Sequence, residues 1–408
     1  MNVQCIKCKG RGFCGRKVCP HIIKSEARFR INKQIEKKDF EASSPTPFVG
    51  RIGYPKLNVG ILSPVEIKQD VWEYDAPRHW AKNNFQIPKI VDYRSALINS
   101  RFTVHAHDSN KMLDIAKEVG MASKPVDLEI NLDEKPRFRM NQDSVTAPIG
   151  PNAGLKKVKI TSNTKINFKV QKVVDDTDLK SKNALLYLYE NGFDENFLSK
   201  ILSIGNLGIK RNRKLVPTRW SITATDDTLG KEIIKEIKDS NQTDYLAFFD
   251  GYLGNYYLIL MFPNVWSYEL FEIYTPKASW NTSNELQYMT DYESYDGRKT
   301  YAENCAGGYY AARLPILEKL KEIKRQSNIL VLRFITGEYS VPLGVWVVRE
   351  AVRKSIQSKP LNFASEELML EYAKKLTKKK FGIDLDNILS KSKIIHNIKT
   401  QITLKKFF

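Results

Sequence analysis

Four of the five cysteines of this 408-residue chain lie close together near its beginning, in the stretch CIKCKGRGFCGRKVC. Cys5 and Cys8 form a Cys-x2-Cys pair, and Cys14 and Cys19 follow shortly after it. In a reducing compartment, clustered cysteines bind metal more often than they form disulfides. Four thiolates at this spacing suit a closed tetrahedral zinc site, so the sequence predicts a zinc-binding module. His21 as a substitute ligand and an iron–sulfur cluster instead of zinc remain open alternatives.

The last eight residues, QITLKKFF, form a second short pattern. Leu404 and Phe407 are three residues apart, so a single 3₁₀ turn places them on one face, which Phe408 extends. Such a segment is too short to bury itself, but it fits an apolar groove on another protein. Gln-x-x-aliphatic-x-x-aromatic-aromatic is the pattern of the PIP box, the peptide that binds the sliding clamp PCNA. The tail therefore predicts PCNA as a partner, bound through Gln401, Leu404, Phe407 and Phe408. The alternative is a tail packed on the chain's own core.

The charge balance indicates a polyanionic partner. The chain has 65 Lys and Arg against 46 Asp and Glu, which gives a net charge of +19 and a pI of about 9.4. The excess is strongest at the ends, in residues 1–40 and 371–408. A surplus of this size attracts nucleic acid first, although a Lys-rich thermophile surface is also basic. We therefore predict contact with DNA.

Arginine and tryptophan residues in the middle of the chain are the candidates for that contact. Arg219, Arg313 and Arg349 are predicted phosphate contacts, and Trp220 or Trp346 a platform on which a base stacks. The alternative is structural: Trp346 belongs to the core, and the Arg349–Glu350–Arg353 stretch forms a solvated ion-pair face.

Catalytic chemistry has weaker candidates. Two-metal nucleases need several carboxylates that converge on Mg²⁺ or Mn²⁺, and no diagnostic spacing links the carboxylates of this chain. The candidates are Asp226, Asp227 and Glu338, with Asp250 and Glu272 behind them. Asp226 and Asp227 are more often helix N-caps. His105 and His107, beside Asp108, resemble metal ligands, but such loop residues are usually solvated. Cys305 is expected to be a small buried hydrophobe and not a nucleophile. Whether the chain is an enzyme stays open.

The predicted elements favour an α+β core, with a mixed sheet and helices. This core follows the small zinc-binding module and precedes a flexible C-terminal peptide. Expected strands cover TRWSITAT (218–225), VDLEINL, WSYELFEIYT and NILVLRFIT, and YLAFFDGYLGNYYLILMFP is expected to form two strands around a glycine turn. Four helices are expected. The first covers 109–119 and ends at Gly120, and the second covers TDDTLGKEIIKEIKDSN, with Asp226 and Asp227 at its junction with the preceding strand. The third covers 314–326, and the fourth begins at a Ser365 cap.

These elements divide into four predicted segments. They are a basic four-cysteine module at 1–40, a core domain at 41–360, a helical region at 361–395 and the tail at 396–408. The chain contains no run of about 18 apolar residues and no signal-peptide pattern near its start. We therefore expect a soluble cytoplasmic protein, associated with the nucleoid and not with a membrane.

Taken together, these motifs are similar to those of the archaeal Nre family. The resemblance extends over almost the whole chain, in the words CIKCKGRGFCGRKVCP, PFVGRIGYPKLNVG, VPTRWSITATDD, GGYYAARLPILEKLKEIKRQ, EYSVPLGVWVVREAVR and QITLKKFF. It implies that the four clustered cysteines form the family's zinc-finger-like element and that the tail is its PIP box. It also implies a part in the response to DNA damage, without a settled catalytic mechanism. His21 lies outside the family's cysteine motif.

Three functions are consistent with these observations. The first is a DNA-binding repair factor that the tail recruits to PCNA. The second is a metal-dependent nuclease or another nucleic-acid-modifying enzyme whose active site lies in the core. The third is a clamp-bound adaptor that recruits other proteins without contacting DNA.

Overall fold

The computed structural model describes residues 8, 11, 13, 19–32, 37–138, 150–281 and 283–400. The chain divides into two compact units. The first consists mainly of Cys19–Leu229 with Val341–Gly344, and the second mainly of Gly230–Ser340 with Val345–Phe408. Each unit combines one six-stranded sheet with helices, which confirms the predicted α+β class. Cys5, Cys14 and residues 401–408 lie outside the described residues, so the zinc module and the tail stay predictions.

The first unit is built on a six-stranded mixed sheet with the strand order β1-β5-β6-β4-β3-β2. Its strands are β1 (Asp39–Ser44), β2 (Thr46–Val49), β3 (Lys56–Ser63), β4 (Ile98–His105), β5 (Val126–Leu132) and β6 (Asn152–Ile160). β4 and β6 are parallel, and the other neighbours are antiparallel. The predicted strand VDLEINL is confirmed as β5, and its buried apolar residues alternate with less buried polar residues, as in a half-buried strand.

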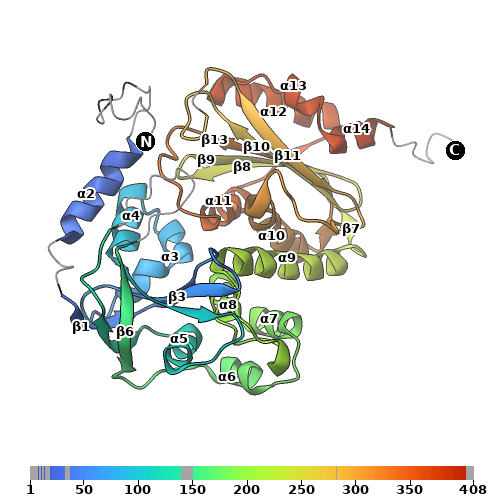
Figure 1. Ribbon diagram of the computed structural model, residues 1–408. Helices are drawn as coiled ribbons and strands as arrows, with labels where there is room; N and C mark the ends of the chain where they lie inside the picture. Colours follow the sequence, from blue (N-terminus) through green and yellow to red (C-terminus); the bar gives the residue numbers. More distant parts are fainter. Residues whose placement is uncertain are drawn as a thin grey trace. The chain divides into compact units, whose positions relative to one another are not determined.

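Helices of the first unit pack on this sheet and on one another (Figure 1). They are α2 (Pro20–Asn32), η1 (Val71–Asp75), α3 (Pro77–Lys82), α4 (Ile87–Ala96), α5 (Lys111–Met121), α6 (Phe168–Asp175), α7 (Ser181–Glu190), α8 (Glu195–Ser203) and η2 (Lys210–Asn212). α5 corresponds to the helix predicted over 109–119, and Asn110 caps it by accepting a hydrogen bond from the Leu113 N–H at 2.9 Å. Gly120 lies inside α5, so the prediction that the helix stops there is wrong.

The predicted strand 218–225 is also wrong, because these residues begin the long helix α9 (Thr218–Ile237). β-branched and aromatic residues suggested a strand. Yet Ser221, Thr225, Leu229 and Ile233 are buried at intervals of four residues, which is the period of one helix face. Tertiary burial therefore outweighs local propensity here. The junction between the two compact units falls within this helix, at Leu229 and Gly230.

The second unit contains a six-stranded sheet with the order β11-β10-β13-β9-β8-β14 and a short parallel pair, β12 with β7. The strands are β7 (Asn241–Gln242), β8 (Tyr245–Tyr252), β9 (Asn255–Phe262), β10 (Ser267–Tyr274), β11 (Gln287–Glu293), β12 (Arg325–Gln326), β13 (Asn328–Ile335) and β14 (Leu361–Phe363). β8 and β9 form the predicted hairpin. Leu253 and Gly254 both have positive φ, 51° and 74°, as a tight two-residue hairpin turn requires.

Helices cover both faces of the second sheet: α10 (Ala306–Ile323) and α11 (Trp346–Gln357) on one face, and α12 (Glu366–Phe381), α13 (Asp386–Leu389) and α14 (Lys393–Thr400) on the other (Figure 1). Ser365 caps α12 as predicted. α10 begins eight residues before the predicted 314–326 span. Its first turns pack closely on the sheet, since a Cβ on Gly308 would lie 2.5 Å from the Glu272 Oε1. None of the described helices is long and apolar enough to cross a membrane.

Candidate nucleic-acid interface

Two aromatic side chains lie exposed beside each other in the first unit. Trp220, in the first turn of α9, is 47% exposed, and Tyr54, in the turn between β2 and β3, is 42% exposed. Their ring centroids are 5.4 Å apart and the ring planes are inclined by 51°. Ile52, in the same turn, is 84% exposed. Large apolar side chains grouped in this way on a surface mark a binding site more often than scattered ones do.

Two hydrogen bonds, one within the backbone and one to a side chain, fix the elements that carry this pair. Gly53 has φ of 90°, and its carbonyl accepts from the Lys56 N–H at 2.9 Å, so the turn that carries Tyr54 is tight. The Val49 N–H, at the end of β2, donates to the Thr218 Oγ1 at 2.9 Å. That bond ties the start of α9 to the strand that leads into the turn. The two rings are therefore held by adjoining secondary-structure elements.

Positive residues flank the two rings in the sequence. Arg51, Lys56 and Arg219 are exposed, and none of them has an ion-pair partner among the described residues. The turn GRIGYPKLN and the stretch IKRNRKLVPTRW contain no Asp or Glu. We refer to Arg51, Ile52, Tyr54, Lys56, Arg219 and Trp220 as the Trp220 surface. It combines unpaired cations with exposed rings, the composition of surfaces that bind single-stranded nucleic acid.

A second basic segment adjoins the Trp220 surface through the backbone. The Leu215 N–H donates to the Ala106 carbonyl, and the Ala106 N–H donates to the Pro55 carbonyl, each at 2.9 Å. Exposed Lys214 therefore lies on the segment next to the turn that carries Tyr54. Lys214 therefore adds a positive charge near the turn, and exposed Asp108, two residues after Ala106, adds a negative one.

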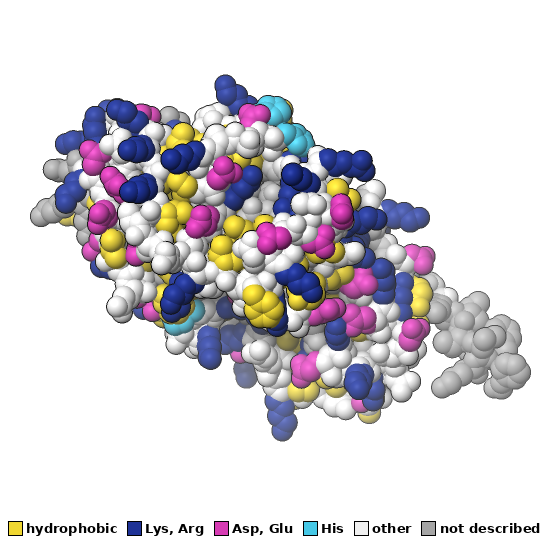
Figure 2. All heavy atoms as spheres, turned by 90° about the horizontal axis from the view of Figure 1, so that it is seen from below, with side chains coloured by type: hydrophobic (Ala, Val, Ile, Leu, Met, Phe, Trp, Pro, Cys, Tyr) yellow, Lys and Arg dark blue, Asp and Glu magenta, His cyan; other side chains and the backbone are white. Residues whose placement is uncertain are grey.

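The net charge of the chain does not by itself locate this site. On the face seen in Figure 2, Lys and Arg side chains are mixed with Asp and Glu. Mixed charges of this kind produce only a weak field at a distance. The local grouping of unpaired cations with aromatic rings therefore identifies the candidate interface better than the total charge does.

Two of the predicted phosphate contacts are buried. Arg313, on α10, is 0% exposed, and Arg349, on α11, is 1% exposed. The Arg313 Nη1 donates to the Glu293 Oε2 at 2.6 Å, and its guanidinium lies 5.4 Å from the ring centroid of Tyr310. In this structure neither guanidinium is accessible to a DNA phosphate. Arg313 is instead part of the interior of the second unit.

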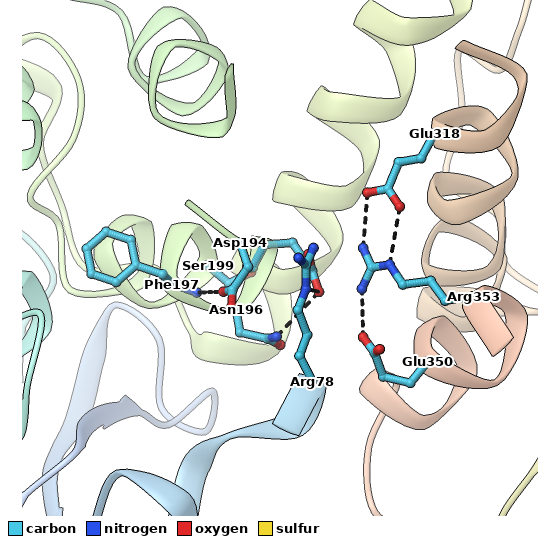
Figure 3. A network of polar contacts seen from close by, with 9 residues as sticks. Arg78, Asp194, Asn196, Phe197, Ser199, Glu318, Glu350 and Arg353 are labelled. Atoms are coloured by element: carbon cyan, nitrogen blue, oxygen red, sulfur yellow. Dashed lines mark hydrogen bonds and ion pairs between the residues drawn. The ribbon is translucent and has the colours of Figure 1, made fainter. Parts of the chain in front are cut away.

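The stretch from Arg349 to Arg353 forms part of a network of charged side chains in the second unit. The Arg353 guanidinium donates to the Glu318 carboxylate at 3.0 and 3.2 Å and to the Glu350 Oε1 at 2.6 Å (Figure 3). Trp346 is only half-buried, and its ring centroid is 6.4 Å from that of Tyr252. Because carboxylates occupy the Arg353 guanidinium on two sides, it is poorly suited to a phosphate.

A similar pairing occupies Arg78 in the first unit. Its Nη2 donates to the Glu195 Oε2 at 2.5 Å, and the Glu195 side chain is fully buried. The Asn196 amide also donates to Glu195 (Figure 3). This arginine serves to neutralise a buried carboxylate at the start of α8.

The carboxylates considered for catalysis do not form one cluster. Asp226 is fully buried and, like Asp227, lies within α9, so the prediction that they stand at a strand-to-helix junction is wrong. Both belong to the first unit, whereas Glu338 belongs to the second, where it accepts a hydrogen bond from the Tyr256 hydroxyl at 2.9 Å. Glu272 forms a buried ion pair with Arg333. Within the described residues, no three His, Cys, Asp or Glu side chains are placed to hold a metal ion.

The histidines beside Asp108 are likewise not part of a metal-binding group among the described residues. His105 and His107 are exposed, with ring centroids 6.5 Å apart, and the Asp108 carboxylate accepts a hydrogen bond from the His105 N–H. Asp108 thus stabilises the turn after β4.

The described cysteines have different surroundings. Cys8 is buried and Cys19 is partly exposed, but Cys5 and Cys14 lie outside the described residues, so the four-cysteine site is untested. Cys305 is 4% exposed, and burial raises the pKa of its thiol far above the ordinary range. A thiol in this state is a poor nucleophile, which confirms the interpretation of Cys305 as a buried hydrophobe.

Sequence reasoning identified Arg219 and Trp220 but missed the four residues of the turn, Arg51, Ile52, Tyr54 and Lys56. The available signal was the turn GRIGYPKLN itself, in which Ile52 and Tyr54 stand between glycines and a proline. Large apolar residues in a turn have no strand neighbours to cover them, so their exposure could have been anticipated.

Comparison with known proteins gives matches over almost the whole chain. The family model described as "Archaeal Nre, N-terminal" matches residues 13–281, and that described as "Archaeal Nre, C-terminal" matches residues 293–407. Together these matches include every residue of the Trp220 surface and most of the tail. No solved structure matches the chain.

Three curated relatives are similar over most of their length. "DNA repair protein NreB" of Archaeoglobus fulgidus is 36% identical over 394 residues, which covers 96% of this chain and 97% of the relative. "DNA repair protein NreA" of the same organism is 38% identical, covering 90% and 91% of the two chains. "DNA repair protein NreA" of Haloferax volcanii is 35% identical, covering 83% of each.

Proposed function

Since this chain belongs to the archaeal Nre family, we propose that it is a DNA repair protein that binds DNA through the Trp220 surface and is recruited to the PCNA sliding clamp by its C-terminal tail. The names of its relatives support the repair role. The observation that carries DNA binding is a pair of exposed rings in the first unit, flanked in the sequence by exposed cations that have no ion-pair partner among the described residues. Binding of this kind would associate the protein with the nucleoid.

The physical basis of this binding is electrostatic. Each Lys or Arg that contacts a phosphate releases a condensed counterion, so affinity falls steeply with salt and depends little on sequence. The two stretches that contain Arg51, Lys56 and Arg219 include no Asp or Glu, and none of the three is occupied by an ion-pair partner among the described residues. A repair protein that acts at varied sites needs sequence-independent affinity of this type.

Charge removal on the Trp220 surface tests the proposal. We expect the triple variant Arg51→Gln, Lys56→Gln and Arg219→Gln to lower DNA affinity by about 10- to 100-fold near physiological salt. The slope of log affinity against log salt should fall by about two to three, because up to three counterions are no longer released. Fluorescence anisotropy with a labelled oligonucleotide, repeated over a salt series, measures both quantities.

The matched control removes three exposed lysines from β6 of the same unit, as Lys156→Gln, Lys157→Gln and Lys159→Gln. Both triple variants lose the same formal charge. An equal loss of affinity in the two variants would show that only total charge matters and would contradict an interface at the Trp220 surface.

Recruitment to the clamp is proposed for the tail. α14 ends at Thr400, and Gln401 to Phe408 follow it with the spacing of a PIP box. Tethering through this peptide would raise the effective concentration of the DNA-binding surface on clamp-loaded DNA. A weak, sequence-independent interface could then act at the right place without high intrinsic affinity.

A zinc ion bound by Cys5, Cys8, Cys14 and Cys19 is also proposed, on the chemistry of four clustered thiolates. We expect about one zinc per chain by elemental analysis, and a clear loss of zinc in Cys8→Ser, because three thiolates hold the ion less tightly. Cys305→Ala, at the buried cysteine of the second unit, is the control and should keep its zinc. Iron and sulfide in place of zinc, or a native protein without metal, would overturn the assignment.

A further inference from the structure

The geometry of the two rings indicates which form of DNA the Trp220 surface binds. This inference rests on the proposed function. Because the planes of Trp220 and Tyr54 are inclined by 51°, the rings do not cover each other face to face. Nearly half of each side chain is open to solvent. The indole therefore offers a ring face on which another flat group can stack.

A base can occupy that face only when it is out of the helical stack. In duplex DNA both faces of each base are covered by its neighbours, and a protein reaches only phosphates, sugars and base edges. In single-stranded DNA every base has an accessible face, and stacking on an aromatic side chain contributes about 1–3 kcal/mol per base. The rings would add nothing to the binding of an intact duplex.

We propose that the Trp220 surface binds unpaired nucleotides, with a base on Trp220 and the flanking phosphates on Arg219, Arg51 and Lys56, so that the protein prefers single-stranded DNA to duplex of the same length. Ile52, which is 84% exposed at the tip of the same turn, supports this assignment. An apolar side chain at this position gains from contact with a base or sugar and has no use for a phosphate.

Charge complementarity favours a nucleic acid over a protein as the occupant. The contrast with Trp72, in η1 of the same unit, makes this clear. Trp72 is 43% exposed, close to the value for Trp220, but Asp70, Glu73 and Asp75 stand beside it in the chain. The T-shaped contact of its ring with His79 has a centroid distance of 4.8 Å. The acidic neighbours of Trp72 would repel a phosphate backbone, whereas the basic neighbours of Trp220 would attract it.

The test compares two tryptophan variants on two DNA substrates. We expect the full-length protein to bind a labelled oligothymidine more tightly than a mixed-sequence duplex of equal length and equal salt. Trp220→Ala should weaken binding to the single strand at least about fivefold, the equivalent of ~1 kcal/mol of stacking, and binding to the duplex less than about twofold. Trp220→Phe, which keeps a ring, should fall between. Trp72→Ala should match the wild-type protein on both substrates.

Fluorescence gives an independent readout. Because a stacked base quenches indole emission, adding oligothymidine should reduce the tryptophan emission of the wild-type protein more than that of Trp220→Ala. Circular dichroism of the variants confirms that the exposed substitutions leave the fold intact.

Two results would overturn the inference, and they are distinguishable. If Trp220→Ala weakens binding to both substrates equally, or to neither, base stacking is wrong while the charge-based proposal of DNA binding stands. If the wild-type protein binds neither substrate at low salt, the proposed DNA binding fails as well.

Discussion

Arg313→Met is expected to lower the free energy of unfolding of the second unit by about 3–5 kcal/mol, the usual cost of breaking a buried ion pair from one side. The side chains of Arg313 and Glu293 are 1% and 0% exposed, and the Nη1–Oε2 distance is 2.6 Å. Glu293 lies on β11 and Arg313 on α10, so the pair joins the sheet to the helix that covers it. Without the guanidinium, a buried carboxylate loses its cation.

Hydrogen–deuterium exchange of peptides from β10 and β13 measures this effect, because it reports on the second unit alone. A whole-chain melting curve would mix the two units. Lys319→Met is the matched control: it makes the same chemical change on the same helix, but Lys319 pairs with the exposed Glu322, and its removal should cost less than about 1 kcal/mol. The double variant Arg313→Met with Glu293→Leu should recover much of the lost stability, because it removes both charges.

The same experiment separates the structural role of Arg313 from the phosphate contact expected from sequence. A variant with native exchange rates but much weaker DNA binding would contradict the interior role and restore the phosphate contact. Loss of stability without a specific loss of DNA affinity at 25 °C would agree with the buried pair.

Sequence reasoning succeeded where local chemistry determines the backbone. The β8–β9 hairpin was predicted because its glycine allows the positive φ that a two-residue turn requires, and α12 was predicted because Ser365 caps a run with acidic residues in its first turn. The α+β class was predicted from short apolar runs separated by turn residues, although a single mixed-sheet core was expected and the structure has one such sheet in each of two units. These features need no knowledge of distant parts of the chain.

Sequence reasoning failed where the conformation or burial of a residue depends on contacts with other secondary-structure elements. The start of α9 has the composition of a strand, and only its burial at every fourth residue reveals a helix. The burial of Arg313 could not be predicted, because its carboxylate partner, Glu293, lies 20 residues earlier on a separate strand and meets Arg313 only in the folded unit. An arginine that faces solvent and one that neutralises a buried glutamate look alike in sequence.

The candidate site shows the same division. Trp220 and Arg219 were predicted to contact nucleic acid because a tryptophan stands beside an arginine, which is a local signal. Their grouping with Tyr54 depends on the Val49–Thr218 hydrogen bond, which joins residues distant in sequence. Single residues of the site were therefore predictable, and its assembly was not.

The helix that precedes the tail, α14, is held in the second unit by contacts of its own. Glu269 on β10 is 1% exposed, and its carboxylate accepts hydrogen bonds from the Ser392 hydroxyl and from the Lys393 and Ile394 N–H groups at 2.5, 2.9 and 3.1 Å. It thereby caps the N-terminus of α14. Ile394 and Ile395 are buried beside it. Burial raises the pKa of the Glu269 carboxyl, although these hydrogen bonds oppose the shift. All of these contacts involve residues before 401.

Because α14 is held by its own contacts, Phe407→Ala with Phe408→Ala should leave the fold and the melting temperature unchanged. The same double variant should weaken binding to a purified archaeal sliding clamp at least about 100-fold, because each buried aromatic anchor at an interface contributes ~2 kcal/mol or more. Isothermal titration calorimetry measures the affinity.

Lys405→Ala with Lys406→Ala is the matched control within the same eight residues. Rim charges act mainly on the association rate, so this variant should lose much less affinity, and the loss should shrink at high salt. DNA binding without the clamp should be the same in all three proteins, because the Trp220 surface belongs to the first unit. Clamp affinity that survives the loss of both phenylalanines would refute the PIP box. A lowered melting temperature would instead indicate that the tail packs on the chain's own core, the alternative that the sequence left open.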